Sequence, residues 1–366
     1  GYLKILASQQ LAPLASIALT SLKLTLSGSL HPTTKHPAMP QSTAKPLGEF
    51  DFIRRYLAAE QPADPELLLG IGDDAAIVRP RPGHDLCFSS DMLLAGHHFF
   101  PDVAPADLAH KILAVNISDM AAMGARPRWV MLSAALPELN PGWLEAFSGS
   151  LFAMLRQYGI TLIGGDTTKG DLVFNVSITG ELPSGQGLRR SGAQNGDDIW
   201  VSGQIGLAAA ALHHIWQNIR LPENLFAECE TARLRPTPRV SLGQALLPVA
   251  TAAQDISDGL AQDLGHILRA SNVGAELYAD LVPTAPGLRQ CLLEQTVYEL
   301  TLAGGDDYEL LFTAPPQARQ AVLTAAESNR TPVTRIGRIN DTGYLKLLRT
   351  NGSELHLAHL GFDHFG

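Results

Sequence analysis

The sequence predicts a two-domain protein of the mixed α/β (α+β) class. Strand-like runs alternate with helix-like runs along most of the chain, which is typical of folds that layer helices on sheets. The length of 366 residues is sufficient for two domains. A turn-rich segment, Pro-Ser-Gly-Gln-Gly at 183–187, separates two such series. We therefore expect an N-terminal domain over residues 46–183 and a C-terminal domain over residues 188–366.

Residues 1–45 differ from the rest, because they contain four lysines and no acidic residue. One interpretation is a targeting peptide, since the segment is acid-poor and partly amphipathic. The segment lacks arginine and also lacks an apolar core followed by a small-residue cleavage site. We therefore favour an extension outside the fold, with Met39 as an alternative start.

The composition limits the partners of the protein. The chain has 36 acidic and 27 basic residues, a net charge of −9, which argues against nonspecific binding to nucleic acid or to an anionic membrane surface. No apolar run approaches the length that spans a bilayer. Cys87, Cys229 and Cys291 are too far apart in sequence to suggest a zinc site or a disulfide framework. We expect a cytoplasmic protein, because free cysteines are typical of a reducing compartment.

Folded sequence is expected from Leu47, with a helix over 48–59 and a strand over 67–78 that Gly70-Ile71-Gly72-Asp73-Asp74 interrupts. This stretch matches the G-x-G-x-x-A pattern of dinucleotide-binding proteins, and Asp91 lies near the expected position of a ribose-binding acid. We reject that interpretation because Ile77 and Val78 favour a strand where a helix is required. Two adjacent carboxylates would also repel a pyrophosphate directly, unless a divalent cation lay between them.

The most unusual predicted element is a helix over 107–124. Leu108, Ile112 and Val115 recur at helical spacing, and Gly124 is placed where a C-terminal glycine is common. The stretch Asn-Ile-Ser-Asp at 116–119 nevertheless interrupts its last turns. A carboxylate in so apolar a helix is costly unless it is paired or binds a metal.

The remaining elements follow in order. We expect strands over 86–93, 129–136, 159–168 and 172–182 with a helix over 143–158. After the boundary come a strand at 198–202, helices over 207–216 and 240–249, a turn at 255–259 that enters a helix over 260–271, and strands at 275–281 and within 302–312. His213 and His214 are interpreted as packing or surface residues.

Nine aspartates lie in short stretches rich in glycine or serine. Aspartate is common in turns and helix caps, so a structural role is as good an explanation for any single stretch. Magnesium prefers oxygen ligands and is usually shared between carboxylates and substrate phosphates, which explains all of the stretches together. These residues are Asp73, Asp74, Asp91, Asp119, Asp166, Asp255, Asp258, Asp306 and Asp307.

Other chemistries fit the sequence less well. It has no G-x-x-x-x-G-K-[ST] loop, no H-R-D and D-F-G pair and no G-x-S-x-G elbow. Glycoside hydrolysis needs only two carboxylates. Phosphoryl transfer depends mainly on alignment and charge neutralisation, for which several carboxylates and Mg²⁺ are suited. The residues alone indicate a magnesium-dependent enzyme that acts on phosphates, with ATP as the expected donor, and they do not identify the acceptor.

The same stretches closely resemble the thiamine-monophosphate kinase family of the aminoimidazole ribonucleotide synthetase superfamily. The resemblance covers residues from about 47 to 366, and its motifs occur in the expected order: GEFDFI, GIGDDAA, SSDMLLAGHHF, PADLAHKILAVNISDMAAMGA, LIGGDTT, RRSGA, DISDGLAQDLGHI, AGGDDYELLFT and GFDHF. It implies phosphorylation of thiamine phosphate to thiamine diphosphate by direct in-line transfer from ATP, assisted by several Mg²⁺ ions.

The resemblance also implies roles for individual residues. It implies that Asp119, Asp166 and Asp258 are catalytic, that Gly165, Asp166, Arg190 and Ser257 contact ATP, and that His98, Asp306 and Phe362 contact thiamine phosphate. The implied metal ligands are Asp74, Ser89, Ser90, Asp91, Asp119, Asp166, Asp255 and Asp258. The family often has Thr where Ser90 stands and commonly Glu where Asp306 stands, so the shorter side chain of Asp306 could place its carboxylate differently.

The resemblance further implies a homodimer in which two N-terminal domains form a β-barrel, a C-terminal α/β sandwich, and an active site in the cleft between the domains.

Two alternative functions remain at this point. One is another ATP-using enzyme of the superfamily, but the selenophosphate and hydrogenase-maturation enzymes need a reactive cysteine that no motif here contains. The other is a non-catalytic nucleotide-binding subunit, which is expected to have lost some of the carboxylates.

Overall fold

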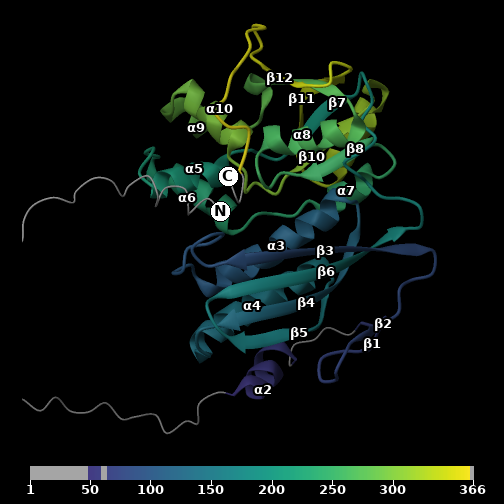
Figure 1. Ribbon diagram of the computed structural model, residues 1–366, viewed down its shortest axis with the longest axis vertical. Coiled ribbons are helices and arrows are strands. Elements are labelled where there is room, and N and C mark those ends of the chain that lie inside the picture. Colours follow the sequence, from purple (N-terminus) through teal and green to yellow (C-terminus); the bar gives the residue numbers. More distant parts are fainter. Residues whose placement is uncertain (1–47, 59–63, 363–366) are drawn as a thin grey trace, which may run out of the picture.

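The computed structural model describes residues 48–58 and 64–362. The predicted extension over 1–45 lies outside the described residues, as does the end of the chain at 363–366. The described chain forms two halves stacked one above the other, with α3 at their junction (Figure 1). The first half holds a four-stranded sheet and ends with β6, and the second half begins with β7 and holds a six-stranded sheet.

The first half begins with a helical segment that differs from the single predicted helix. An α-helical turn, α2 (Glu49–Phe52), continues as a π-helical turn, η1 (Ile53–Leu57). The predicted strands and both longer helices are present, with ends shifted by a few residues. The elements are β1 (Leu67–Leu69), β2 (Ile77–Val78), β3 (His84–Leu94), α3 (Pro105–Ala122), β4 (Arg126–Leu136), α4 (Pro141–Tyr158), β5 (Thr161–Lys169) and β6 (Val173–Pro183).

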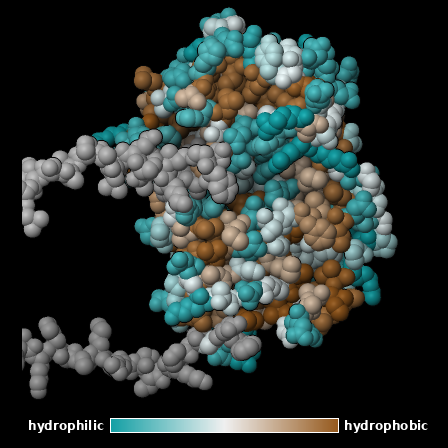
Figure 2. Space-filling model, in the orientation of Figure 1, coloured by the Kyte–Doolittle hydropathy of each residue, from teal (hydrophilic) through white to brown (hydrophobic). Residues whose placement is uncertain are grey.

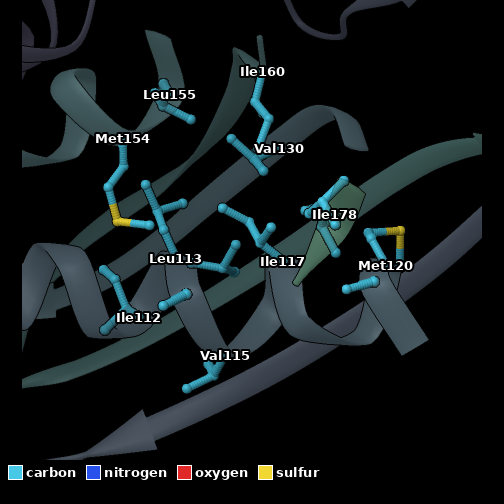
Figure 3. Close-up of a cluster of buried hydrophobic side chains, with 14 of the residues drawn as sticks. Ile112, Leu113, Val115, Ile117, Met120, Val130, Met154, Leu155, Ile160 and Ile178 are labelled. Carbon is cyan, nitrogen blue, oxygen red and sulfur yellow. The ribbon is translucent and has the colours of Figure 1, made fainter. Parts of the chain in front are cut away.

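The sheet of the first half has the order β3-β6-β4-β5. β6 is antiparallel to β3 and β4, and β5 is parallel to β4. Both α3 and α4 pack against one face. Ile112, Leu113 and Ile117 of α3 belong to the same buried cluster as Val130 of β4 and Ile178 of β6 (Figure 3). Because α3 is buried over most of its surface, polar groups on it need partners.

The other face of this sheet is open in the described chain. Phe88 and Met92 on β3 are 70% and 56% exposed, and Met131 on β4 is 47% exposed. Hydrophobic side chains stand among hydrophilic ones on the face of this half seen in Figure 2. β3 and β5 are the two edges of the sheet, so residues 48–58 and 64–362 form no closed barrel on their own.

The second half contains the remaining elements. Its strands form a sheet with the order β12-β9-β11-β7-β10-β8, antiparallel except where β12 pairs with β9. The elements are β7 (Asp198–Ser202), α5 (Leu207–Ile215), α6 (Glu223–Leu234), α7 (Val240–Leu246), β8 (Ala252–Asp255), α8 (Leu260–Ser271), β9 (Gly274–Tyr278), η2 (Ala279–Leu281), α9 (Pro286–Cys291), α10 (Glu294–Ala303), β10 (Leu310–Ala314), η3 (Pro316–Ala318), α11 (Arg319–Ser328), β11 (Val333–Asn340) and β12 (Leu345–Leu348).

Side chains of the six-stranded sheet enter two different cores. Ile199 and Val201 of β7, with Leu311 of β10, belong to the cluster that includes α8. Trp200 and Phe312 point to the opposite face and belong to the large cluster that continues into the first half. This alternation is the period of two expected of a strand with both faces buried. One hydrophobic core therefore runs across the junction of the two halves.

The two halves also meet at very close range through α3 and α7. A Cβ atom on Gly243 of α7 would lie 2.0 Å from the carbonyl oxygen of Ala121. Just after α3, the carbonyl oxygen of Met123 accepts a hydrogen bond of 3.0 Å from the backbone amide of Leu188. The polar residues in the last turns of α3 consequently lie at the junction. Within the described ranges, no helix has both the length and the hydropathy needed to cross a membrane.

Candidate active site

A cavity of about 420 Å³ lies between the two halves. The first half contributes the end of β3, the loop after it and α3. The second half contributes α5, α6, the end of β8 and the loop after it, the loop before β10 and the end of the described chain. The predicted site residues that line the cavity are Asp91, His98, Asp119, Asp255, Ser257, Asp258, Asp306 and Phe362.

The helix α3 runs along the cavity and gives it two chemically different ends. Lys111, Val115 and Asp119 all line the cavity and follow each other at intervals of four residues, which places them on one side of the helix. Eight residues of α-helix correspond to about 12 Å along the axis. The cavity therefore has a cation at one end of this stripe and a carboxylate at the other.

The carboxylate end is a group of four aspartates, Asp91, Asp119, Asp255 and Asp258, which we call the acidic cluster. Burial, and then the neighbouring Asp119, raise the pKa of Asp91 to about 7. The same two causes raise the pKa of Asp255 well above its usual value. Burial also raises the pKa of Asp119. Asp91 and Asp255 therefore lie close enough to Asp119 for its charge to raise their pKa values, and a nearby cation would favour the charged forms of all three.

Each polar residue in the last turns of α3 has a partner in or beside the acidic cluster. Asn116 Oδ1 accepts a hydrogen bond of 3.1 Å from the backbone amide of Asp91. Ser118 Oγ donates to Asp255 Oδ2 over 2.7 Å. Asp119 Oδ2 accepts a hydrogen bond from the Ser89 hydroxyl. These contacts explain why three polar residues interrupt an otherwise apolar helix.

The loop that carries Ser257 and Asp258 is held by a residue inside the following helix. The carboxylate oxygen Asp263 Oδ2 accepts hydrogen bonds of 3.1 Å from three successive backbone amides, those of Ser257, Asp258 and Gly259. Its other oxygen accepts a hydrogen bond of 2.6 Å from Gln254 Nε2. The N-cap of α8 is Gly259, and both Ser257 and Asp258 line the cavity.

The loop before β10 places two residues in an uncommon backbone conformation. Asp306 and Tyr308 have φ angles of 65° and 53°, in the left-handed region that non-glycine residues rarely adopt. Their backbone amides donate hydrogen bonds of 2.8 Å to the carbonyl oxygens of Ser257 and Ile256. The side chain of Asp306 meets Lys111 Nζ at 2.6 Å across the junction of the halves. Such outliers often mark functional sites.

His98 and Phe362 complete the part of the cavity near Asp306. The Nδ1 atom of His98 accepts a hydrogen bond of 3.1 Å from the backbone amide of Leu94, so a neutral His98 carries its proton on Nε2. Phe362 is anchored by its backbone, because its amide donates to the carbonyl oxygen of Asp258 over 2.9 Å. Its carbonyl oxygen accepts from Gln262 Nε2 over 2.7 Å. The last three residues of the terminal GFDHF stretch, 363–365, lie outside the described residues.

Several predicted site residues do not line the cavity. Ser89 and Arg190 lie beside the acidic cluster. Ser89 donates a hydrogen bond to Asp119. Burial raises the pKa of Asp119, and the positive charge of Arg190 partly opposes this effect. Asp74 is exposed in the loop between β1 and β2. Ser90 is also exposed, and its hydroxyl lies 3.1 Å from that of Ser177 on the open face of the sheet.

Gly165 and Asp166 lie on β5, at the sheet edge farthest from β3. Asp166 pairs with Ser133 of β4, and Ser133 pairs with Asn175 of β6. Asn175 in turn pairs with Met92 of β3, whose side chain faces outward. Asp166 therefore belongs to the open face. Three strand spacings separate the edge strands, a distance of about 14 Å. Gly165 has a structural explanation of its own, because a Cβ there would lie 1.8 Å from the carbonyl oxygen of Leu132.

Sequence reasoning missed four residues with evident roles at the cavity. Lys111, Arg233 and Tyr308 line its wall, and Asp263 holds one of its loops. The signal for Lys111 was present, since a lysine between the apolar residues of a buried helix is as unusual as an aspartate. Arg233 lies in α6, whose sequence carries no clear apolar periodicity, so only the structure could place it.

Comparison with known proteins identifies related families and structures. Residues 72–182 match the family model described as "AIR synthase related protein, N-terminal domain", and residues 194–349 match "AIR synthase related protein, C-terminal domain". The thiamine-monophosphate kinase of Salmonella typhimurium is 44% identical to this chain over 320 residues, which cover 87% of this chain and 98% of the relative.

Two solved structures support the same relationship. The crystal structure of thiamine-monophosphate kinase from Stenotrophomonas maltophilia has a TM-score of 0.77 and 46% identity, and the match covers 83% of this chain and 97% of that one. The AaThiL structure in complex with AMPPCP and TMP has a TM-score of 0.68 and 28% identity, and the match covers 89% of this chain and 100% of that one.

Proposed function

This chain belongs to the thiamine-monophosphate kinase family, and we propose that the cavity between its halves is where ATP and thiamine phosphate react. The reaction is the ATP-dependent phosphorylation of thiamine phosphate. The main support for this site is that one cavity contains both the acidic cluster and the group Asp306, His98 and Phe362. The acidic cluster is suited to binding metal-bound phosphates. Asp306, His98 and Phe362 are suited to binding an organic cation.

The acidic cluster is proposed to hold Mg²⁺. Its donor set fits that ion, because carboxylate oxygens and the Ser89 hydroxyl are hard oxygen ligands of the kind that Mg²⁺ prefers. The raised pKa values of Asp91 and Asp255 further support the fit, since a bound cation removes the repulsion that causes part of each shift. When bound, Mg²⁺ neutralises phosphate charge and helps to align the reacting groups.

The proposed transfer is direct. An oxygen of the acceptor phosphate forms a bond to the γ-phosphorus of ATP, the bond from that phosphorus to the β,γ-bridging oxygen breaks, and ADP and thiamine diphosphate result. No side chain becomes covalently attached. Asp119 belongs to the first half and Asp258 to the second, so the packing of the halves sets the alignment of the two substrates.

The end of the cavity near Asp306 is proposed to bind the organic part of thiamine phosphate. The positively charged thiazolium ring is attracted by the carboxylate of Asp306. The aromatic ring of Phe362 offers a face to the same cation. His98 offers a hydrogen-bond donor at Nε2.

The other predicted residues retain their proposed roles on the basis of the family resemblance. Asp166 is also proposed as a catalytic residue and, with Gly165, Arg190 and Ser257, as an ATP contact. Asp74, Ser90 and Asp166 are proposed as further metal ligands. Asp74, Ser90 and Asp166 lie outside the wall of the cavity, so the family resemblance alone supports their proposed roles.

We also propose a homodimer in which the open faces of two four-stranded sheets associate and together form a barrel. The exposed apolar side chains of Phe88, Met92 and Met131 support this, since a large apolar patch on a sheet usually marks an interface. The proposed domains span residues 46–183 and 188–366. A cytoplasmic location is proposed from the free, widely separated cysteines.

The test of the function is a product assay. The protein is incubated with ATP, Mg²⁺ and thiamine phosphate, and the products are separated by chromatography. Thiamine diphosphate and ADP in equal amounts are the expected result. ADP without thiamine diphosphate would indicate a different acceptor, and ATP binding without either product would indicate a non-catalytic protein.

A further inference from the structure

Lys111 is a buried lysine in the wall of the cavity. Its side chain is 4% exposed, and its ammonium group lies 2.6 Å from Asp306 Oδ2 and 2.8 Å from the carbonyl oxygen of Arg233. Removing an ammonium group from water is costly unless a nearby anion compensates it. Here the compensating anion comes from the other half of the molecule and is a proposed substrate contact.

We infer that Lys111 is a positioning residue for the acceptor substrate, which fixes one oxygen of Asp306 so that the carboxylate meets the cationic heterocycle in one orientation. This inference rests on the proposed function, because it takes Asp306 to be a contact of thiamine phosphate. It adds a second polar residue of the first half, beside His98, to a binding end whose carboxylate, Asp306, comes from the second half.

The surroundings of Asp306 support a fixed orientation. Its backbone is held at a φ of 65°, and its amide is bonded to Ser257. Tyr308 lies beside it: burial, and then the charge of Asp306, raise the pKa of the Tyr308 hydroxyl, which remains protonated and able to donate. Asp306 is thus constrained by its own loop on one side and by Lys111 on the other. Preorganisation of this kind lowers the entropic cost of binding.

The position of Lys111 along α3 indicates a role in binding thiamine phosphate and not in binding ATP. The α-carbon of Lys111 is about 12 Å from that of Asp119 along the helix axis. Side chains on an α-helix lean towards its N-terminus, so the ammonium group is directed away from the acidic cluster. Substitution of Lys111 should therefore affect the binding of thiamine phosphate and leave the binding of ATP largely unchanged.

The other cation of this end has a different partner. The guanidinium group of Arg233 forms hydrogen bonds of 2.7 and 2.6 Å with Glu230 and lies 5.2 Å from the centroid of the Phe100 ring. Lys111 is the cation that meets Asp306. Without it, Asp306 would add an uncompensated carboxylate to a cavity that is already acidic, and Mg²⁺ could compete for that carboxylate with the organic cation.

The test compares Lys111→Met with the unsubstituted enzyme. We expect the KM for thiamine phosphate to rise about tenfold or more, as for loss of a charge-assisted hydrogen bond, with kcat and the KM for ATP close to their original values. Lys111→Arg should recover part of the loss. Lys346→Met, on β12, is the matched control and should change nothing. An unchanged KM for thiamine phosphate in Lys111→Met would overturn the inference.

A double substitution then tests whether Lys111 acts through Asp306. If it does, Lys111→Met should add little to the KM increase caused by Asp306→Asn. Independent, multiplicative effects would mean that Lys111 contacts the substrate directly, which contradicts a positioning role. If Lys111→Met folds poorly, Lys111→Gln gives the same comparison, with equilibrium binding of thiamine phosphate normalised to the folded fraction. Failure of the unsubstituted enzyme to form thiamine diphosphate would instead reject the proposed function itself.

Discussion

Ser118 Oγ donates a hydrogen bond of 2.7 Å to Asp255 Oδ2 and thereby joins the central helix of the first half to β8 of the second. Ser118 is fully buried, and the carboxylate of Asp255 is almost so. The bond places Asp255 next to Asp119, the residue that follows Ser118. The acidic cluster is therefore assembled by the packing of the halves, and its affinity for a cation depends on both of them.

Asp119→Asn tests whether the central carboxylate is essential. The amide keeps the shape of the side chain and removes its charge, so we expect the fold to persist and kcat to fall by at least about 100-fold. The measurement is kcat at saturating Mg²⁺, with the thermal midpoint as the check on folding. Asp102→Asn, at an exposed position before α3, is the control. Near-normal turnover in Asp119→Asn would exclude an essential role.

Asp263→Asn tests the residue that holds the loop of Ser257 and Asp258. One carboxylate oxygen accepts hydrogen bonds from three backbone amides, and the other accepts one from Gln254 Nε2. In the Asn variant one of these oxygens is replaced by an NH₂ group, which is a donor and cannot accept these hydrogen bonds. We expect kcat to fall about 10- to 100-fold, as for other substitutions of residues that orient ligands. Asp341→Asn, exposed after β11, should retain full activity. Equal activities of the two variants would contradict the role of Asp263.

Gly243→Ala tests the close packing of α7 against α3. The new Cβ would lie 2.0 Å from the backbone oxygen of Ala121, which cannot rotate away, so the helices must separate. We expect the free energy of unfolding to fall by about 1–3 kcal/mol. Gly149→Ala in α4 is the matched control, because its Cβ would have no heavy atom within 4 Å. That variant should instead gain about 0.5–1 kcal/mol.

Glu181→Gln tests a buried ion pair by its pH dependence. Burial alone would raise the pKa of Glu181, but hydrogen bonds from Arg81 and Arg128 and the charge of Arg128 outweigh it and lower the pKa below 4.5. A carboxyl group with a lowered pKa stabilises the fold above its ordinary pKa and loses that contribution as the pH falls. Both side chains of the Arg128–Glu181 pair are at most 5% exposed.

At pH 7 we expect Glu181→Gln to destabilise the fold by about 1.5–3 kcal/mol, because Arg128 loses its charge-assisted hydrogen bond to Glu181 but keeps Glu66 as a partner at 2.7 Å. The difference from the unsubstituted protein should shrink as the pH falls below 4.5. Thermal unfolding measured from pH 7 to pH 3.5 checks this. A difference that stays constant over the range would show that the charge of Glu181 is not the cause.

The sequence predicted those parts of the fold and site where the local pattern is strong. Helical spacing identifies α3, and glycine beside aspartate marks the loops that hold Asp258 and Asp306. Resemblance to known kinases was needed to name the acceptor. Composition and spacing could not distinguish thiamine phosphate from other phosphates.

What the sequence could not predict depends on contacts between distant segments. No local pattern places Lys111 against Asp306, which are 195 residues apart, or assigns three backbone amides to Asp263. The helix α6 was missed because its apolar residues follow no clear helical period, and α11 was not among the predicted elements either. A sequence motif can also have a structural cause. Gly165 is required because a side chain there would collide with the backbone of Leu132, whether or not Gly165 contacts a nucleotide.

Phe88→Asp tests the proposed dimer. Phe88 is 70% exposed on the open face of the four-stranded sheet, so its replacement costs the single chain little. In a dimer built on that face, the same change buries a carboxylate, which is unfavourable without a partner. We expect sedimentation velocity to show a dimer for the unsubstituted protein and a monomer for Phe88→Asp at the same concentration. Leu293→Asp, 79% exposed before α10, is the control and should remain dimeric. A dimer that survives Phe88→Asp would place the interface elsewhere, and a monomeric unsubstituted protein would reject the dimer.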